Sequence, residues 1–238
     1  MPDGVGCAVH AGTKLYFRAP DGTQTELCAD MNEAFSQSFT MKGVLYLMDG
    51  KTYRAVHKSS KNTAWEAVSV SGTAYVPTTT ISAAPTGGGT SYEAVNLLTP
   101  KRINTFIGDG TATQFKVDAT DLDETAVTAE VNGSAVTVSA VNRSTGLVTL
   151  AAAPANGNGL ANVSIAFAKT VSGHADKINK CRFAGLYGGK NDTRVFLSGN
   201  PDEPDCDWQS GLYDPTYFPD TGYTRMGTDA SAIVGYLK

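Results

Sequence analysis

The sequence predicts an all-β fold, in which propeller-type blades made of antiparallel meanders carry a small inserted β-sandwich domain. Short apolar and β-branched runs recur at spacings of about 8–12 residues, a pattern typical of sandwiches, barrels and propellers. Turn residues (Gly, Pro, Asn and Asp) separate these runs. Between Thr73 and Arg102 the composition shifts to Thr, Ser, Gly and Pro, which indicates a boundary between two strand-rich parts.

Residues 1–75 are predicted to form propeller-like strands joined by short turns. Pro20-Asp21-Gly22 fixes one φ angle and then permits a positive one, as a turn between strands requires. Asp49-Gly50 is a strong hairpin signal. The expected strands are Val5–Val9, Lys14–Arg18, Thr25–Cys28, Val44–Met48, Thr52–Val56 and Trp65–Val70. Their repeated strand-turn-strand order favours propeller blades.

Residues 76–102 are predicted to be a Thr/Gly/Pro-rich connection, because the run TTTISAAPTGGGT at 78–90 is typical of linkers. Residues 92–98 (YEAVNLL) are compatible with a strand or with a single helical turn, since so short a run has no readable period.

Residues 103–171 are predicted to form the inserted β-sandwich. Asn132-Gly133 fits the two positive φ angles of a type I′ hairpin turn. The expected strands are Thr105–Ile107, Gln114–Val117, Val127–Val131, Ala135–Val138, Val141–Leu150 with a turn at 144–146, and Asn162–Phe167. A segment of about 65 residues with some seven short alternating strands is small for a sandwich but sufficient.

Residues 172–238 are predicted to return to propeller-like strands and to contain an aromatic and acidic loop. Arg194–Ser198 and Ala232–Leu237 are the expected strands. Four prolines in residues 200–223 remove backbone donors, so we expect no regular structure there. Because disordered segments contain few aromatic residues, we expect an ordered loop that packs its own rings.

The loop and its flanking strands also carry a family resemblance. The run FLSGNPDEPDCDWQSGLYDPTYFPDTGY at 196–223, followed by Met226-Gly227, resembles virion structural proteins from tailed phages and prophages of Gram-positive bacteria. The resemblance extends from about Val5 onward, and it implies β-propeller blades with an immunoglobulin-like domain inserted between them. The strand pattern of 103–171 is likewise similar to immunoglobulin-like modules of phage tail and head accessory proteins.

The resemblance implies a non-enzymatic virion protein that scaffolds the tail or the head-to-tail connection. The expected partners are other virion proteins and copies of the same chain, with no cofactor. The expected location is the virion, after synthesis in the bacterial cytoplasm. The alternative is a phage tail module that binds a glycan or a protein on the host surface. A ring-like assembly would favour the scaffold over the binding module.

The loop supplies the candidate site residues. Four rings could line a sugar-binding platform beside two acids, although packing within the chain or at a subunit contact is favoured because large rings usually serve burial. These residues are Trp208, Tyr213, Tyr217, Phe218, Asp205 and Asp207. A glycosidase would need a pair of carboxylates across a cleft, which the loop acids could form only in the folded chain.

Composition excludes several other classes. Nineteen basic and 23 acidic residues give a net charge of −4, and no Lys/Arg cluster occurs, so no nucleic-acid partner is expected. No apolar stretch is long enough for membrane insertion. The three histidines are scattered and the four cysteines lack C-x-x-C spacing, so no catalytic or metal site is predicted. Cys7, Cys28 and Cys181 are expected in the core.

Overall fold

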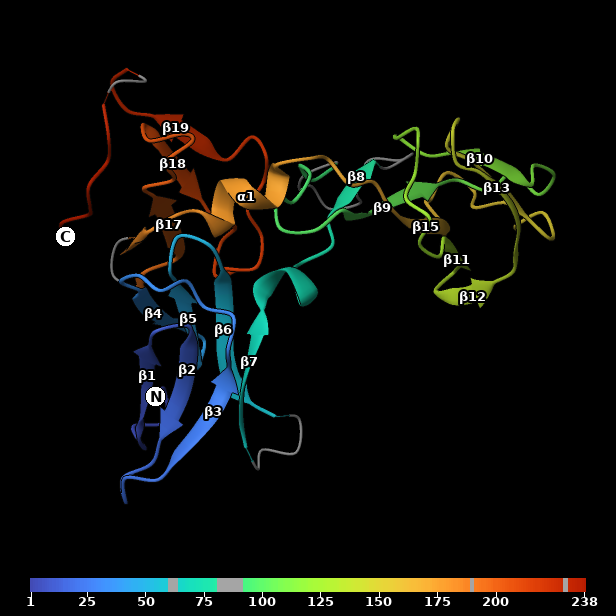
Figure 1. Cartoon of the computed structure of the whole chain (residues 1–238). Coiled ribbons are helices and arrows are strands. Elements are labelled where there is room, and N and C mark those ends of the chain that lie inside the picture. The colour runs from blue at the N-terminus through green and yellow to red at the C-terminus, as the bar shows by residue number, and fades with distance from the viewer. Residues whose placement is uncertain (60–63, 81–91, 189–190, 229–230) are drawn as a thin grey trace. The chain divides into compact units, whose positions relative to one another are not determined.

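The computed structural model describes residues 1–59, 64–80, 92–188, 191–228 and 231–238 (Figure 1). Regular structure in these residues is almost entirely β-strand in several antiparallel sheets, so the predicted all-β class is confirmed. The chain divides into two compact units. Unit 1 comprises Met1–Ala74 and Gly173–Lys238, and unit 2 comprises Tyr75–Ser172. Unit 1 is therefore built from two separate stretches of sequence.

Unit 1 begins with two antiparallel meanders, with the strand orders β1-β2-β3 and β4-β5-β6-β7 (Figure 1). The strands are β1 (Cys7–Ala11), β2 (Lys14–Arg18), β3 (Gln24–Cys28), β4 (Gln37–Met41), β5 (Val44–Met48), β6 (Tyr53–Lys58) and β7 (Trp65–Ser69). A 3-10 turn at Val70–Gly72 follows β7. Lys42-Gly43 joins β4 to β5 with two positive φ angles, 50° and 75°, which is the backbone of a tight hairpin.

One buried carboxylate stabilises the loop between β5 and β6. Asp49 is fully buried, and its Oδ1 accepts hydrogen bonds from the backbone N–H groups of Lys51 at 2.9 Å and Thr52 at 2.6 Å. Its Oδ2 accepts a third from the N–H of Asn32 at 2.7 Å. Since a buried carboxylate is tolerated only when donors satisfy it, Asp49 both closes the predicted hairpin and fixes the segment before β4.

The first two sheets pack face to face. Successive side chains of a strand point to opposite faces of its sheet, and one set forms a shared core of Leu15 from β2, Leu47 from β5 and Val56 from β6, with Met31 between the sheets. Each of these side chains is at most 5% exposed. Burial of each is worth roughly 1.5–3 kcal/mol.

Aromatic residues cover the opposite face of the second sheet. Phe39 of β4 stacks on Tyr46 of β5 with ring centres 5.1 Å apart, and Tyr46 lies 5.8 Å from Tyr53 of β6. The edge of Phe218 meets Tyr53 at 6.2 Å. The second sheet is therefore covered on both faces, on one by the first sheet and on the other by residues from the second stretch of unit 1.

The third sheet of unit 1 has the order β16-β17-β18-β19 and follows a short helix (Figure 1). The elements are α1 (His174–Asn179), β16 (Phe183–Tyr187), β17 (Arg194–Ser198), β18 (Cys206–Gln209) and β19 (Tyr223–Arg225). The Gln37 side chain of β4 accepts a hydrogen bond from the backbone N–H of Ala184 in β16 at 2.7 Å. This bond adds to the aromatic contact between the two stretches of unit 1.

Unit 2 is a two-sheet sandwich with the strand orders β10-β14-β13 and β12-β11-β15-β9-β8. The strands are β8 (Thr78–Thr80), β9 (Lys101–Phe106), β10 (Gln114–Lys116), β11 (Thr128–Val131), β12 (Ser134–Val136), β13 (Val138–Asn142), β14 (Leu147–Leu150) and β15 (Val163–Ala168). Phe115 and Val148 from one sheet and Ile165 from the other meet in its core. Asn132-Gly133 has φ angles of 50° and 75°, so the predicted hairpin turn is confirmed.

Some local predictions are wrong. Residues 200–223 are not wholly irregular, because β18 lies inside them and pairs with β17 and β19. Residues 232–237 form no strand; the backbone N–H of Ile233 bonds instead to the carbonyl of Pro204 at 3.0 Å. Cys7 is exposed rather than in the core.

Other elements went unpredicted or differ from the prediction. Strand β4 and helix α1 were not predicted. The described part of 76–102 is not a separate connection, because β8 pairs in parallel with β9 inside unit 2. Residues 92–98 form neither a helix nor a strand.

Because unit 2 has its own core, removing it should leave unit 1 folded. We expect a chain in which a short Gly/Ser bridge replaces residues 75–172 to unfold in a single cooperative transition and to keep the near-ultraviolet circular dichroism of its packed rings. Thermal melting of the excised and the full chain, side by side, measures this. A molten or aggregated product would contradict the division into two units.

Candidate functional site

The six predicted site residues do not gather on one exposed face. Trp208 and Phe218 are at most 1% exposed, and Asp205 and Asp207 are 3% and 6% exposed. Tyr217 is half-buried, and Tyr213 is 42% exposed. The loop therefore buries most of the side chains that a sugar-binding platform would have to present, and this geometry favours the packing interpretation for the four buried residues.

Trp208 is held from two sides. It lies on β18, where the ring of Tyr223 from β19 packs at 5.1 Å. The amino group of Lys177, from α1, lies 5.1 Å from the centre of the indole ring, within the range of a cation–π contact. Among the described residues the indole Nε1 has no hydrogen-bond partner, so Trp208 contributes to stability through its ring rather than its N–H group.

Phe218 and Pro215 attach the loop to the second sheet. Phe218 is fully buried against Tyr53. The Tyr53 hydroxyl donates a hydrogen bond to the carbonyl of Pro215 at 3.0 Å, across 162 residues of sequence. Burial raises the pKa of the Tyr53 hydroxyl well above its ordinary value, so the group stays protonated and remains a donor.

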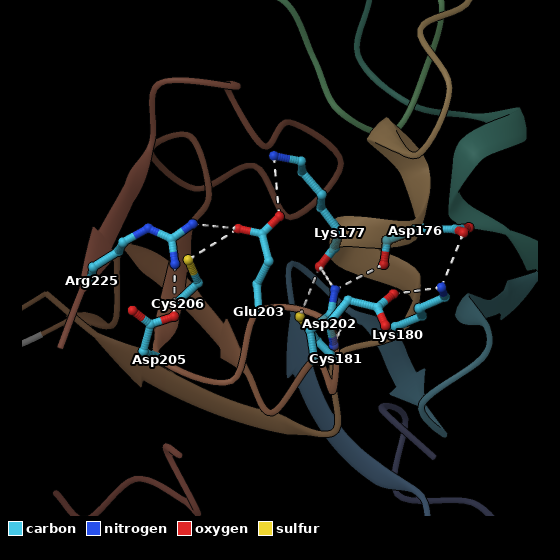
Figure 2. A network of polar contacts seen from close by, with 10 residues as sticks. Asp176, Lys177, Lys180, Cys181, Asp202, Glu203, Asp205, Cys206 and Arg225 are labelled. Carbon is cyan, nitrogen blue, oxygen red and sulfur yellow. Dashed lines mark hydrogen bonds and ion pairs between the residues drawn. The ribbon is translucent and has the colours of Figure 1, made fainter. Parts of the chain in front are cut away.

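A second set of contacts centres on Glu203 (Figure 2). One carboxylate oxygen pairs with Lys177 at 3.2 Å, and the other pairs with Arg225 at 3.0 Å. Arg225 also pairs with Asp205 at 2.7 Å. Because the loop, α1 and β19 each contribute a charge, the network fixes the loop relative to both elements, although half-exposed pairs of this kind add little free energy.

Two thiols lie in the same network (Figure 2). The Cys206 thiol donates to Glu203 at 3.2 Å, and the Cys181 thiol donates to the backbone carbonyl of Lys177 at the same distance. Burial raises the pKa of both thiols, and Glu203 adds to this effect at Cys206, whose pKa reaches about 11. Since the thiolate is the reactive form, these cysteines act as packing residues with weak donors.

The two acids of the predicted site have different partners. Asp205 pairs with Arg225, whereas Asp207 accepts a hydrogen bond from the Tyr236 hydroxyl at 2.5 Å. Burial raises the pKa of the Asp207 carboxyl, and the Tyr236 bond partly opposes that rise. The two carboxylates therefore have separate partners on separate elements, β19 for Asp205 and the segment 231–238 for Asp207.

Tyr213 is the most exposed ring of the predicted set. It has a left-handed φ of 53°, and its backbone N–H bonds to the carbonyl of Thr193 at 2.6 Å. The Lys42 amino group lies 5.9 Å from the ring centre. The adjacent Leu212 is 63% exposed. Leu212 and Tyr213 together are a small exposed apolar projection.

No group of three or more His, Cys, Asp or Glu side chains in the described part of the chain is placed to hold a metal ion. Within the same residues, no helix has the length and apolar character needed to cross a membrane.

The sequence interpretation missed the residues that organise this region. Glu203 was one of several loop acids without a distinguishing neighbour, and Tyr53, Lys177 and Tyr236 lie in other segments of the chain. Of these residues, only Tyr53 lies in a run whose pattern predicts a buried strand. Their roles depend on contacts between distant parts of the chain.

Comparisons with family models, with curated proteins and with solved structures find no match to this chain.

We expect Trp208→Ala to lower the free energy of unfolding by about 3–5 kcal/mol, because it empties a fully buried ring site. The melting temperature should fall by several degrees. Trp208→Phe, which keeps an aromatic ring and removes the unpaired N–H, should cost less. Tyr213→Ala is the matched surface control and should stay within about 0.5 kcal/mol of the wild type. Equal losses for Trp208→Ala and Tyr213→Ala would contradict the burial of Trp208.

The raised pKa of Asp207 predicts a pH dependence. Because the folded pKa lies above the ordinary value of 3.8, ionisation of Asp207 costs native stability as the pH rises from that value through the folded pKa. Asp207→Asn removes this loss and keeps an acceptor for Tyr236. Relative to the wild type, the variant should gain stability toward neutral pH, and the gain should vanish below about pH 4. Chemical denaturation at a series of pH values measures the difference, and a difference that does not change with pH would contradict the prediction.

Proposed function

We propose that this chain is a non-enzymatic structural protein of a phage or prophage virion, in which the three sheets of unit 1 are propeller-type blades and unit 2 is an inserted immunoglobulin-like domain. It serves as a scaffold of the tail or of the head-to-tail connection, and it acts through contacts with other virion proteins and with copies of itself. The sequence resemblance of residues 196–223 is one support for this proposal.

The observation that carries the proposal is the stacking of antiparallel meanders in unit 1. The second sheet has an apolar core on one face and stacked rings on the other, so it lies between two neighbours as a blade does in a propeller. Two of the three sheets have four strands in sequence order, which is the composition of a blade. Three blades are fewer than a propeller needs, so closure requires further sheets or another chain.

The strand order of unit 2 supports its assignment as an immunoglobulin-like domain. In such domains strands B, E and D form part of one sheet, and C pairs with F in the other. Here β10-β14-β13 occupies the first arrangement and β11-β15 the second, with the same sequence order. One feature departs from that pattern, because β9 pairs antiparallel with β15 at the position that strand G would occupy.

Outward-facing side chains of the first sheet support contacts with another protein. Leu15 and Ala8 point into the core shared with the second sheet, so the alternation of strand side chains places Val9 and Tyr16 on the other face. Val9 and Tyr16 are register partners and are both half-buried. An apolar pair with an ion pair beside it, Lys14 with Glu26 at 2.6 Å, suits a protein contact with a polar rim.

The burial of Trp208 and Phe218 weighs against the alternative of a glycan-binding module. Sugar platforms present aromatic faces to solvent, whereas here the rings hold the loop in place. The scaffold interpretation needs no exposed ring in this loop.

We expect the purified full chain to form defined oligomers whose population rises with concentration in sedimentation velocity. Tyr16→Ser should weaken this association, because it removes an outward ring from the first sheet, with a small change in melting temperature. Tyr92→Ser, which removes an exposed ring of unit 2, is the matched control and should leave the association unchanged. A chain that stays monomeric at all concentrations and binds cell-wall glycans would overturn the scaffold in favour of the binding module.

A further inference from the structure

The outer face of the third sheet carries an apolar groove that residues 231–238 cross. Its volume is about 570 Å³, and its walls include Tyr187 and Phe196 from the sheet and Tyr236 and Leu237 from the crossing segment. Phe196 and Gly185 are register partners on β17 and β16, so they share this face. Tyr236 covers the groove without filling it.

The groove is shaped for the ring that it holds. A Cβ atom on Gly185 would lie 2.8 Å from Cγ of Tyr236, and its three nearest neighbours would all be atoms of the Tyr236 side chain. Glycine at this position therefore lets the ring lie directly on the strand. At the other end of the ring, the hydroxyl donates to the buried carboxylate of Asp207 at 2.5 Å. One surface thus recognises both the flat face and the hydroxyl of a tyrosine.

The crossing segment is otherwise loosely attached. Its other contacts with unit 1 include the bond from the Ile233 N–H to the Pro204 carbonyl at 3.0 Å and an ion pair between Lys238 and Asp192. Val234 is 81% exposed, and the Leu237 side chain is fully exposed. Apart from Ile233 and Tyr236, the apolar side chains of this segment therefore bury little surface against unit 1.

We propose that the groove is a docking site for residues 231–238 of a second copy of this chain, with Tyr236 of one copy lying on Gly185 and Asp207 of the other. The groove recognises a tyrosine in this chain's own segment, and a second copy supplies the same segment. Exchange of an identical element is a low-cost route to association, because each contact that is broken within one chain is remade between chains.

This inference rests on the proposed function in one respect. In isolated chains the attached segment has a high effective concentration and competes with exchange. Copies held side by side in an assembly raise the concentration of the neighbouring segment and so favour exchange. The groove and its preference for tyrosine do not depend on the proposed function.

The first experiment tests the groove on the full chain. Tyr236→Ala vacates it, and a labelled peptide of residues 231–238 is then titrated and followed by fluorescence anisotropy. We expect saturable binding, and at least about tenfold weaker binding of a peptide with Phe in place of Tyr236, because a hydrogen bond to a charged group is lost. Adding Gly185→Ala to the protein should abolish binding, since the new Cβ would lie only 2.8 Å from the ring and clash with it. No binding to the Tyr236→Ala chain overturns the proposal.

The second experiment tests the second copy as the occupant. Gly185→Ala blocks the groove of a donor chain and releases its segment, while Tyr236→Ala provides the acceptor groove. The tagged Tyr236→Ala chain should capture the Gly185→Ala chain more strongly than it captures the Gly185→Ala/Tyr236→Ala chain. This double variant is the control, because it differs from the donor only in lacking Tyr236. Equal capture would overturn exchange between copies and leave the segment as an internal strap.

The two experiments separate this inference from the proposed function. If the peptide fails to bind but the wild-type chain still forms defined oligomers, the groove proposal fails and the scaffold proposal stands. If the peptide binds and the variants exchange segments, but the wild-type chain stays monomeric in sedimentation velocity, the groove proposal stands and the scaffold proposal fails.

Discussion

The contact between Tyr53 and the segment Pro215–Phe218 is the constraint on which unit 1 depends. The two stretches of unit 1 are separated by all of unit 2, so no local hairpin can bring them together. The Tyr53 ring meets Phe218, and its hydroxyl bonds to the Pro215 carbonyl, which supplies apolar burial and a directional bond at one place. Closing so long a loop costs entropy, and the stacked rings of Phe39 and Tyr46 enlarge the buried surface that offsets it.

This constraint explains the composition of the loop that meets Tyr53. Prolines lower the entropy of the unfolded chain, and buried rings fix the loop to the sheets on either side. Its acids then have structural partners: Glu203 joins α1 to β19 through Lys177 and Arg225, and Asp207 holds Tyr236. A loop that resembles a binding site in sequence is thus used mainly to join parts of one unit, and the open groove lies on the far side of the same sheet.

The two units differ in how their cores are specified. Unit 2 is continuous in sequence, and its sandwich core forms within that single stretch. Unit 1 layers three meanders, and its second sheet is covered on one face by the first sheet and on the other by residues of the second stretch. That arrangement leaves outward faces at both ends of the stack, on the first sheet at Val9 and Tyr16 and on the third sheet at Gly185 and Phe196. The proposals of a scaffold and of segment exchange both concern these end faces.

The sequence by itself determined the all-β class, the positions of strands such as β2, β5 and β17, and the turn at Asn132-Gly133, because these depend on local alternation and on φ preferences. Tertiary structure alone decided the rest. Strand β18 exists because β17 and β19 supply its partners, which local proline content could not reveal. Residues 232–237 have a strand-like composition but find no ladder, so they cross the sheet as a strap. Trp208 and Asp207 are buried because elements distant in sequence cover them, and only the folded chain brings those elements together.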